Sequence, residues 1–267
     1  AAGDATSAIA RSHFPSYTAL GREVPAFTGV AAYAPLKLAL GSGVDAYPIR
    51  AQLVTPNLFS VLGVRAELGR FFVSEEGEGT RGAAVAILGY SFWRGKFAAD
   101  SGVLGRAVSI GDVTYLVVGV APEGFTGVDL EPIDLFLPVS AASDQGGPQG
   151  WTESYGSTWL RIIARLRDNA TDEVAVAQAT ATVRATNERS GLPQVILANS
   201  VLLAPLSAAR GTERQLEVKV SIALGVVSLA VLLSACANVA FILLAKGVER
   251  RREVAVRLAL GANRARL

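Results

Sequence analysis

Hydrophobic and polar residues alternate in short stretches from the start of the chain to about residue 200, and this pattern predicts strands. Residues 28–40 and 47–54 are predicted to be strands, and the Gly-Ser-Gly turn that joins them is typical of a hairpin. Residues 106–110 and 113–120 alternate around Gly111-Asp112, which is a strong hairpin signal. The pattern therefore predicts two pairs of antiparallel strands.

Apolar stretches without alternation predict buried strands and short helices between these hairpins. Pro56 is suited to the first turn of a helix, and we expect this helix to end at Gly63. Residues 84–88 form a short apolar strand, which is followed by a helix containing Trp93 and Phe97.

A β-α-β unit is predicted over residues 158–203. Leucine and isoleucine alternate with arginine from Leu160 onward, which indicates a strand with one exposed face. Residues 171–189 indicate a helix ended by Gly191, and residues 195–203 indicate the returning strand. Two strands joined by such a crossover normally lie in one sheet. We therefore expect an α+β (mixed α/β) domain in two lobes.

A run of 26 residues without charge, residues 220–245, is long enough to cross a bilayer as a helix. The alternative is a buried helix of a large soluble core. Such helices are usually shorter, and this run is followed closely by three arginines, so the pattern favours one transmembrane helix. Its position far from the start of the chain excludes a signal peptide.

The charges on either side of this run predict its orientation. The chain carries a net charge of +2, but residues 246–267 alone carry +5. Because positive flanks stay on the cytoplasmic side, we expect residues 246–267 in the cytoplasm and residues 1–217 in the periplasm, with the helix in the inner membrane.

Small and polar residues within the run predict helix packing. Ala230, Ser234 and Asn238 recur at intervals of four, and Ser221 and Gly225 form a second pair. Small residues let helices approach closely, and an asparagine amide in lipid favours a hydrogen bond to another helix. A lone anchor helix is the alternative, because a serine hydroxyl can bond to its own backbone.

Candidate chemistry is sparse. One cysteine and one histidine exclude a disulfide framework and a thiolate–imidazole zinc cluster. His13 indicates an ordinary polar residue, and Glu75, Glu76 and Glu78 indicate a solvated acidic loop. The basic end has no aromatic residue after Phe241 for stacking on bases, so nucleic-acid binding is not expected. We expect no catalytic, cofactor-binding or metal-binding residues, and a tethered hydrolase lacks a nucleophile–base pair.

Several longer motifs occur in order along the chain: VTPNLFSVLGV at 54–64, LGRFF at 68–72, VAIL at 85–88, LGR at 104–106 and YLVVGVAPEGF at 115–125. Together they resemble the periplasmic core domain of macrolide-exporter-type (MacB-like) ABC permeases. RREVAVRLALGA at 251–262 is similar to the segment after the second transmembrane helix of FtsX-like permeases. FTGVAAY at 27–33 resembles the large-ectodomain variants of acidobacterial permeases.

The resemblance implies a four-helix permease protomer that forms a homodimer or permease pair. It implies a partner ABC ATPase in the cytoplasm, which would hold ATP and magnesium, and a possible periplasmic adaptor. We expect this chain to hold only part of such a permease. The implied divisions are a porter-like lobe (1–54 and 140–209), an inserted second lobe (55–139), a stalk and transmembrane helix (210–248), and a cytoplasmic coupling segment (249–267).

The coupling segment has features suited to contact with an ATPase. Glu253 and Arg257 are spaced to brace a helix, Gly261 can end it, and Asn263, followed by Arg264, can cap a second helix. The implied role is non-catalytic: ATP hydrolysis elsewhere moves the outer domain for export or mechanotransmission. The alternative is a single-pass membrane-anchored extracytoplasmic binding or sensor domain, in which the basic flank only sets the orientation.

Overall fold

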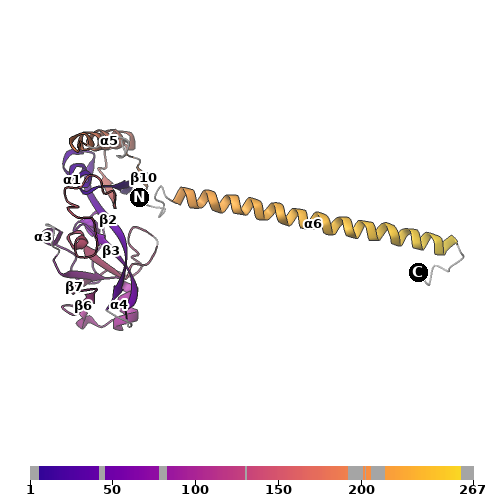
Figure 1. The fold of residues 1–267 in the computed structure, drawn as a ribbon, viewed down its shortest axis with the longest axis horizontal. Coiled ribbons are helices and arrows are strands. Elements are labelled where there is room, and N and C mark those ends of the chain that lie inside the picture. Colours follow the sequence, from indigo (N-terminus) through magenta and orange to yellow (C-terminus); the bar gives the residue numbers. More distant parts are fainter. Residues whose placement is uncertain are drawn as a thin grey trace. The chain divides into compact units, whose positions relative to one another are not determined.

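A computed structural model of the chain describes residues 6–41, 46–77, 83–129, 131–191, 201, 203–205 and 214–259. The chain divides into two compact units, Ala1–Thr212 and Glu213–Leu267, which are described separately (Figure 1).

Among the described residues of the first unit, one mixed sheet has ten strands in the order β10-β1-β9-β2-β3-β8-β5-β7-β4, with β6 paired to β2 and β7. The β3–β8 and β5–β7 pairs are parallel, and the other pairs are antiparallel. The strands are β1 (Thr6–Ser12), β2 (Phe27–Leu40), β3 (Tyr47–Val54), β4 (Leu68–Gly69), β5 (Val85–Leu88), β6 (Ala107–Ile110), β7 (Val113–Val120), β8 (Leu135–Pro138), β9 (Leu160–Leu166) and β10 (Ala204–Pro205). The helices of this unit are α1 (Phe14–Glu23), α2 (Leu58–Val61), α3 (Ser74–Gly77), α4 (Tyr90–Phe97), α5 (Asp172–Arg189) and the 3₁₀ turns η2 (Ser101–Val103) and η3 (Val139–Ala142).

Both predicted hairpins are confirmed. Strands β2 and β3 pair without interruption from Tyr33↔Val54 to Leu40↔Tyr47, although their turn, residues 42–45, lies outside the described residues. Strands β6 and β7 pair around Gly111, whose positive φ of 58° suits a tight turn.

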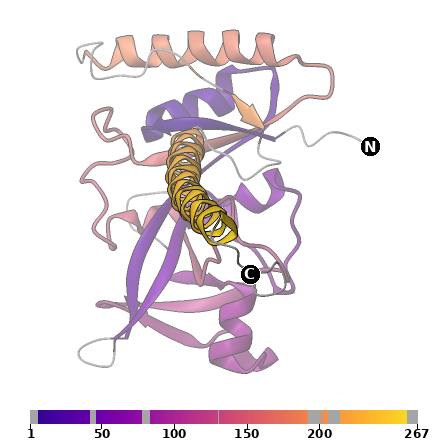
Figure 2. The ribbon, with the colours of Figure 1, turned by 90° about the vertical axis from the view of Figure 1, so that its right-hand side faces the viewer.

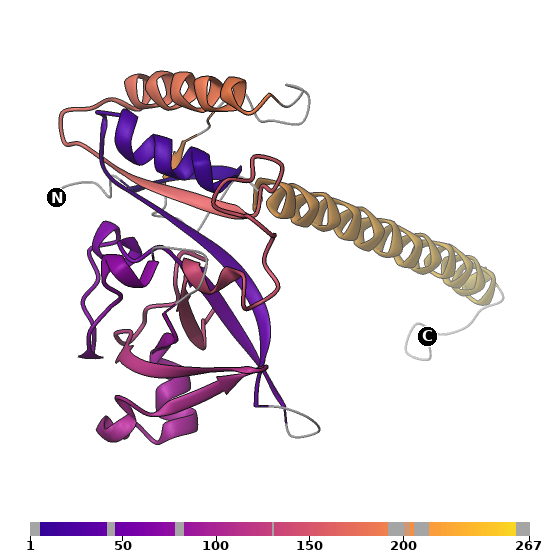
Figure 3. The ribbon, with the colours of Figure 1, turned by 60° about the vertical axis from the view of Figure 1, so that its left-hand side comes forward.

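The predicted β-α-β unit is confirmed for its first strand, β9, and its helix, α5. The described residues of the predicted returning strand, Val201 and Leu203, are not in a strand, and the short strand β10 follows them. Strands β9 and β10 are both antiparallel to β1, so they are parallel to each other but β1 lies between them. The sequence did not predict β1, and its insertion splits the unit. Helices α1 and α5 lie side by side over this end of the sheet, while α4, β6 and β7 lie at the opposite end (Figures 2 and 3). Most of the predicted returning strand, residues 192–200 and 202, lies outside the described residues.

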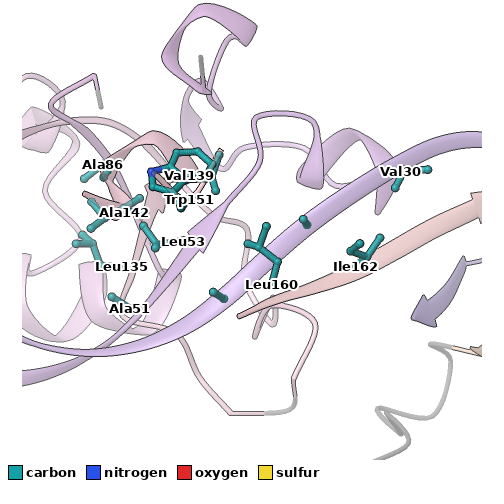
Figure 4. Close-up of a cluster of buried hydrophobic side chains, with 14 of the residues drawn as sticks. Val30, Ala51, Leu53, Ala86, Leu135, Val139, Ala142, Trp151, Leu160 and Ile162 are labelled. Carbon is teal, nitrogen blue, oxygen red and sulfur yellow. The ribbon is translucent and has the colours of Figure 1, made fainter. Parts of the chain in front are cut away.

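Alternating residues of the central strands divide between two buried clusters, one on each face of the sheet. In β8, Leu135 and Leu137 join the first cluster and Phe136 joins the second. The first cluster, part of which Figure 4 shows, continues into α1, α4 and α5, and the second continues into α2. Because both faces are covered, β5 and β8 are continuously apolar.

The strands from residues 55–139 occupy one contiguous half of the sheet, from β8 to β4, and the remaining strands occupy the other half (Figure 3). The fold is mixed α/β, as predicted. The proposed boundaries between lobes follow this division but stay a prediction.

The described part of the second unit, residues 214–259, is one helix, α6 (Arg214–Ala259), of 46 residues. Its segment Val227–Leu244 is long and apolar enough to cross a membrane, and none of it is buried within the chain. The helix extends beyond the uncharged run at both ends, so no break separates the run from the charged residues that flank it.

Candidate functional site

Hydrogen bonds and ion pairs of polar side chains connect distant segments of the first unit. We call each such group of contacts a joint, and the first joint lies where the chain leaves β3. The Ala32 amide donates a hydrogen bond to Thr55 Oγ1 (2.9 Å), and Thr55 Oγ1 donates to Asn57 Oδ1 (2.8 Å). Asn57 Nδ2 then donates to the Val30 carbonyl (2.7 Å). The exit from β3 is therefore bound to β2, at the expected boundary between the two lobes.

The same motif, residues 54–64, also contributes an aromatic residue, Phe59, to the second buried cluster. Phe59 is fully buried and stacks on Phe71, with 3.9 Å between ring centroids. It also contacts Phe125 at 5.8 Å and Phe136 at 5.4 Å, the latter edge to face. The motif at residues 54–64 thus has a polar part that fixes the backbone and an apolar part that fills the core.

A second joint ties residues 122–134 to the other half of the sheet. Arg161 Nη1 donates to both carboxylate oxygens of Asp129, at 3.0 and 2.9 Å, and the Tyr33 hydroxyl donates to Asp129 Oδ1 at 3.3 Å. Burial, assisted by the negative charge of Asp129, raises the pKa of Tyr33 well above its usual value, so this hydroxyl stays a donor. Both partners of Asp129 belong to the predicted porter-like lobe.

Beneath the same segment lies Gln52 of β3, which is fully buried. Among the described residues, neither its Oε1 nor its Nε2 has a hydrogen-bond partner. Gly127, at φ +80°, covers it so closely that an added Cβ would lie 3.2 Å from Gln52 Oε1. An unpaired amide in a core is costly and is rare in native proteins.

Glu76 corrects the prediction of a solvated acidic loop. Its side chain is buried and accepts two hydrogen bonds from Arg70, at 2.9 and 2.7 Å, and one from the Val73 amide at 2.9 Å. The bonds from Arg70 lower the pKa of this carboxyl below its usual value. Glu75 is exposed, and Glu78 lies outside the described residues.

His13 also differs from its prediction as an ordinary polar residue, because it is only 2% exposed. Its Nδ1 accepts the Ser16 amide (3.1 Å) at the start of α1, and its Nε2 contacts Asn187 Oδ1 of α5 (3.0 Å). With Nδ1 accepting, the Nε2–H donates, which defines the neutral tautomer. Burial lowers the pKa of the imidazole below its ordinary value. His13 thus connects α1 to α5.

The predicted packing residues Ser221, Gly225, Ala230, Ser234 and Asn238 all lie within α6. The last four are exposed on this chain. Because α6 is unbroken, Ala230, Ser234 and Asn238 share one stripe of the helix. Their role in packing stays a prediction.

The predicted coupling residues are only partly described. Glu253 and Arg257 lie on α6, one turn apart, whereas Gly261, Asn263 and Arg264 lie outside the described residues. Across the part of the chain that the structure describes, no group of three or more His, Cys, Asp or Glu residues could hold a metal ion.

Comparisons with known proteins agree with this architecture. Residues 3–182 match the family model described as the MacB-like periplasmic core domain. The periplasmic region of MacB from Actinobacillus actinomycetemcomitans is 15% identical, with a TM-score of 0.57 over 80% of this chain and 94% of that chain. A domain of a putative permease protein from Porphyromonas gingivalis is 18% identical, with a TM-score of 0.56 over 76% of this chain and 90% of that chain.

A third similar structure is the extracellular domain of the noncanonic ABC-type transporter YknZ from Gram-positive bacteria. It is 14% identical, with a TM-score of 0.53 over 74% of this chain and 99% of that chain. No curated protein sequence matches the chain. At these identities the structural likeness establishes the fold, and the family match covers well over half of the residues.

Proposed function

Because the chain belongs to the family of MacB-like periplasmic core domains, we propose that it is the extracytoplasmic domain and one membrane helix of an ABC transporter permease. The observation that carries the proposal is the order of its parts: the family domain over residues 3–182, then an unbroken α6 with an exposed apolar span. In this proposal the first unit is periplasmic, α6 crosses the inner membrane and residues 246–267 enter the cytoplasm.

In this proposal ATP hydrolysis takes place on a partner protein. A cytoplasmic ABC ATPase holds ATP and magnesium, and this chain contributes no catalytic or cofactor-binding residue. The permease forms a homodimer or a permease pair, with a periplasmic adaptor as a possible further partner. The transported substrate or regulated partner is recognised by the outer domain, whose fold does not define it.

Coupling in this proposal is mechanical. An unbroken helix of 46 residues is about 69 Å long, at about 1.5 Å per residue, so it reaches beyond a hydrocarbon core of about 30 Å on both sides. Movement of its cytoplasmic end, where Glu253, Arg257, Gly261, Asn263 and Arg264 meet the ATPase, displaces its outer end. This displacement changes the position of one half of the sheet relative to the other. The contacts of Asp129 with Arg161 and Tyr33 lie between the two halves and control this movement.

Cross-linking that joint tests the proposal. The complete permease, with Cys236 replaced by alanine and its ATPase present, is reconstituted as Asp129→Cys/Arg161→Cys and treated with a bifunctional thiol-reactive cross-linker, which replaces the length of the lost arginine side chain. We expect transport per ATP to fall at least several-fold while ATP hydrolysis continues. The matched control is Lys37→Cys/Arg50→Cys, which joins cross-strand partners within the β2–β3 hairpin and should leave coupling unchanged.

Two outcomes contradict the proposal. Equal transport by the cross-linked and untreated Asp129→Cys/Arg161→Cys permease would show that coupling needs no movement between Asp129 and Arg161. Failure of the membrane-inserted chain to associate with any ABC ATPase would favour the single-pass anchored binding or sensor domain.

A further inference from the structure

Helix α6 continues without a break past the end of its apolar span, and this fixes the depth of the basic residues that follow. Lys246 lies two residues after Leu244, and Arg250, Arg251 and Arg252 follow within eight residues. At about 1.5 Å per residue they lie about 3 to 12 Å beyond the span. The headgroup layer of a bilayer extends about 5 to 8 Å beyond each side of the hydrocarbon core. With the core ending near Leu244, Lys246 lies within this layer and the three arginines begin a few Å outside it, a distance that long basic side chains can span.

The opposite end of the span has no such cluster. Counting back from Val227, the first charged residue is Lys219, eight positions away, and Glu217 and Arg214 come next. The same rise per residue puts Lys219 about 12 Å from the span, where the charges nearly balance. The excess of positive charge is therefore at one end of α6, where Lys246 and three arginines follow the span within eight residues.

In the sequence, acidic residues stand at helical pairing distance from Lys246, Arg250 and Arg252 but not from Arg251. Glu249 lies three positions from Lys246 and from Arg252, and Glu253 lies three from Arg250, which are distances at which helical side chains pair. The positions three and four residues from Arg251 are Gly247, Val248, Val254 and Ala255. None of these four is charged, so Arg251 has no acidic neighbour along its own helix.

Gly247 has no side chain on the side of α6 that it shares with Arg251. It lies one turn before Arg251, between that residue and the span, and a Cβ built on it would meet nothing within 4 Å. An arginine guanidinium binds a phosphate with two hydrogen bonds, and a basic cluster directly beside a membrane helix attracts anionic lipids.

We propose that residues 246–252 of α6 bind the phosphate group of an anionic phospholipid, with Arg251 as the central contact. The inference rests on α6 crossing the membrane, as proposed above, and on no property of the ATPase. It assigns the basic flank a ligand in addition to its effect on orientation.

The test is lipid selectivity of the full 267-residue chain in phosphatidylcholine bilayers. Spin-labelled phosphatidylglycerol or phosphatidylcholine is added in trace amount, and the fraction immobilised by the protein is measured. We expect a preference for phosphatidylglycerol of roughly fivefold. Arg251→Gln/Arg252→Gln should reduce it below about twofold, whereas Arg251→Lys/Arg252→Lys should retain most of it, because attraction to the lipid follows charge.

The matched control, Arg22→Gln/Lys37→Gln, removes two exposed charges of the first unit and should leave the preference unchanged. The proposal is overturned if the glutamine variant at 251 and 252 keeps the full preference. It is also overturned if inorganic phosphate abolishes the preference when chloride at equal ionic strength does not, because the site would then bind free phosphate.

Absence of any immobilised lipid would overturn the premise that α6 crosses the membrane. Failure of ATP-coupled transport would leave this measurement unaffected, so the two proposals fail separately.

Discussion

Tyr33 and Arg161 are direct cross-strand partners in β2 and β9, and their side chains converge on the same carboxylate, that of Asp129. Two residues from one half of the sheet thereby hold a loop that belongs to the other half. This relationship leads to the first of five predictions.

Arg161→Ala should lower the free energy of unfolding by about 1 kcal/mol, because it removes a two-oxygen ion pair that is partly screened by solvent. The Arg161 and Asp129 side chains are 24% and 36% exposed. All three tryptophans lie in the first unit, so tryptophan fluorescence during denaturation of the full chain reports on it alone. Arg94→Ala, which breaks an exposed pair with Glu123 at 3.8 Å, is the control and should have almost no effect.

Gln52→Met should stabilise the first unit by about 1 kcal/mol, because it replaces an unpaired buried amide with an apolar side chain of similar length. The same substitution at Gln145, whose Nε2 donates to the Tyr115 hydroxyl at 2.8 Å, should destabilise it by about 1 kcal/mol. Chemical denaturation of the two variants compares them directly. A loss of stability in Gln52→Met would mean that the amide has a partner in solution.

Stability should depend on pH through His13. Its pKa in the folded state is below the ordinary value of 6.5, so the unfolded chain takes up a proton first as the pH falls. The free energy of unfolding should therefore decrease from about pH 6.5 down to the lowered pKa and then level off, as far as this group is concerned. Protonated Nδ1 can no longer accept the Ser16 amide.

His13→Asn should remove this dependence, because asparagine can still cap α1 but does not titrate. Denaturation curves measured between pH 5 and 8 provide the comparison. His13 is the one histidine of the chain, so the imidazole signals in a proton NMR titration report the same pKa directly. Glu76, whose pKa is lowered, loses its contribution at more acidic pH, as the pH falls from the ordinary carboxyl pKa of 4.5 towards the lowered value. An unchanged slope in His13→Asn would assign the dependence to another group.

Alanine substitutions at two glycines should have opposite effects on the free energy of unfolding. A Cβ on Gly119 of β7 would collide with the backbone carbonyl of Arg70, so Gly119→Ala should destabilise by about 2 kcal/mol or more. A Cβ on Gly95, inside α4, would meet nothing within 4 Å, so Gly95→Ala should stabilise by about 0.5 to 1 kcal/mol. Thermal unfolding of both variants measures the difference, and a neutral Gly119→Ala would show that β7 can shift away from Arg70.

Asn238→Leu should weaken association of the membrane helices by about 1 kcal/mol if α6 packs against another helix. Energy transfer between labelled chains in vesicles measures the dimer population. Val239→Leu, one position away and off the stripe of Ala230, Ser234 and Asn238, is the control. An unchanged population in Asn238→Leu would favour a lone anchor helix.

The sequence predicted elements whose residues repeat with a clear period. Strands β2, β3, β6 and β7 alternate with a period of two, and α5 and α6 are long enough for composition and end signals to define them. Strand β1 was not predicted because its alternation is weak. Strand β8 is as apolar as the predicted β5, but it ends in a proline and directly follows residues 122–134, which are rich in glycine, proline and acidic residues. Helix α1 begins at a histidine cap, which is an unusual start signal.

The polar contacts of the first unit could not be predicted from local sequence. His13 and Asn187 are 174 positions apart, and only the packing of α1 on α5 brings them together. Glu76 and Arg70 are six positions apart in an irregular segment, where no helical or strand spacing relates them. The missed residues are therefore those whose partners depend on tertiary structure.

Strand β10 pairs with β1 through two residue pairs, Ser7↔Pro205 and Ala8↔Ala204. In this antiparallel arrangement the beginning of β1 and the end of β10 lie next to each other, at one edge of the sheet. We expect a force that draws the two ends of the domain apart to act first on these two residue pairs, because they alone join the edge strand β10 to its neighbour among the described residues.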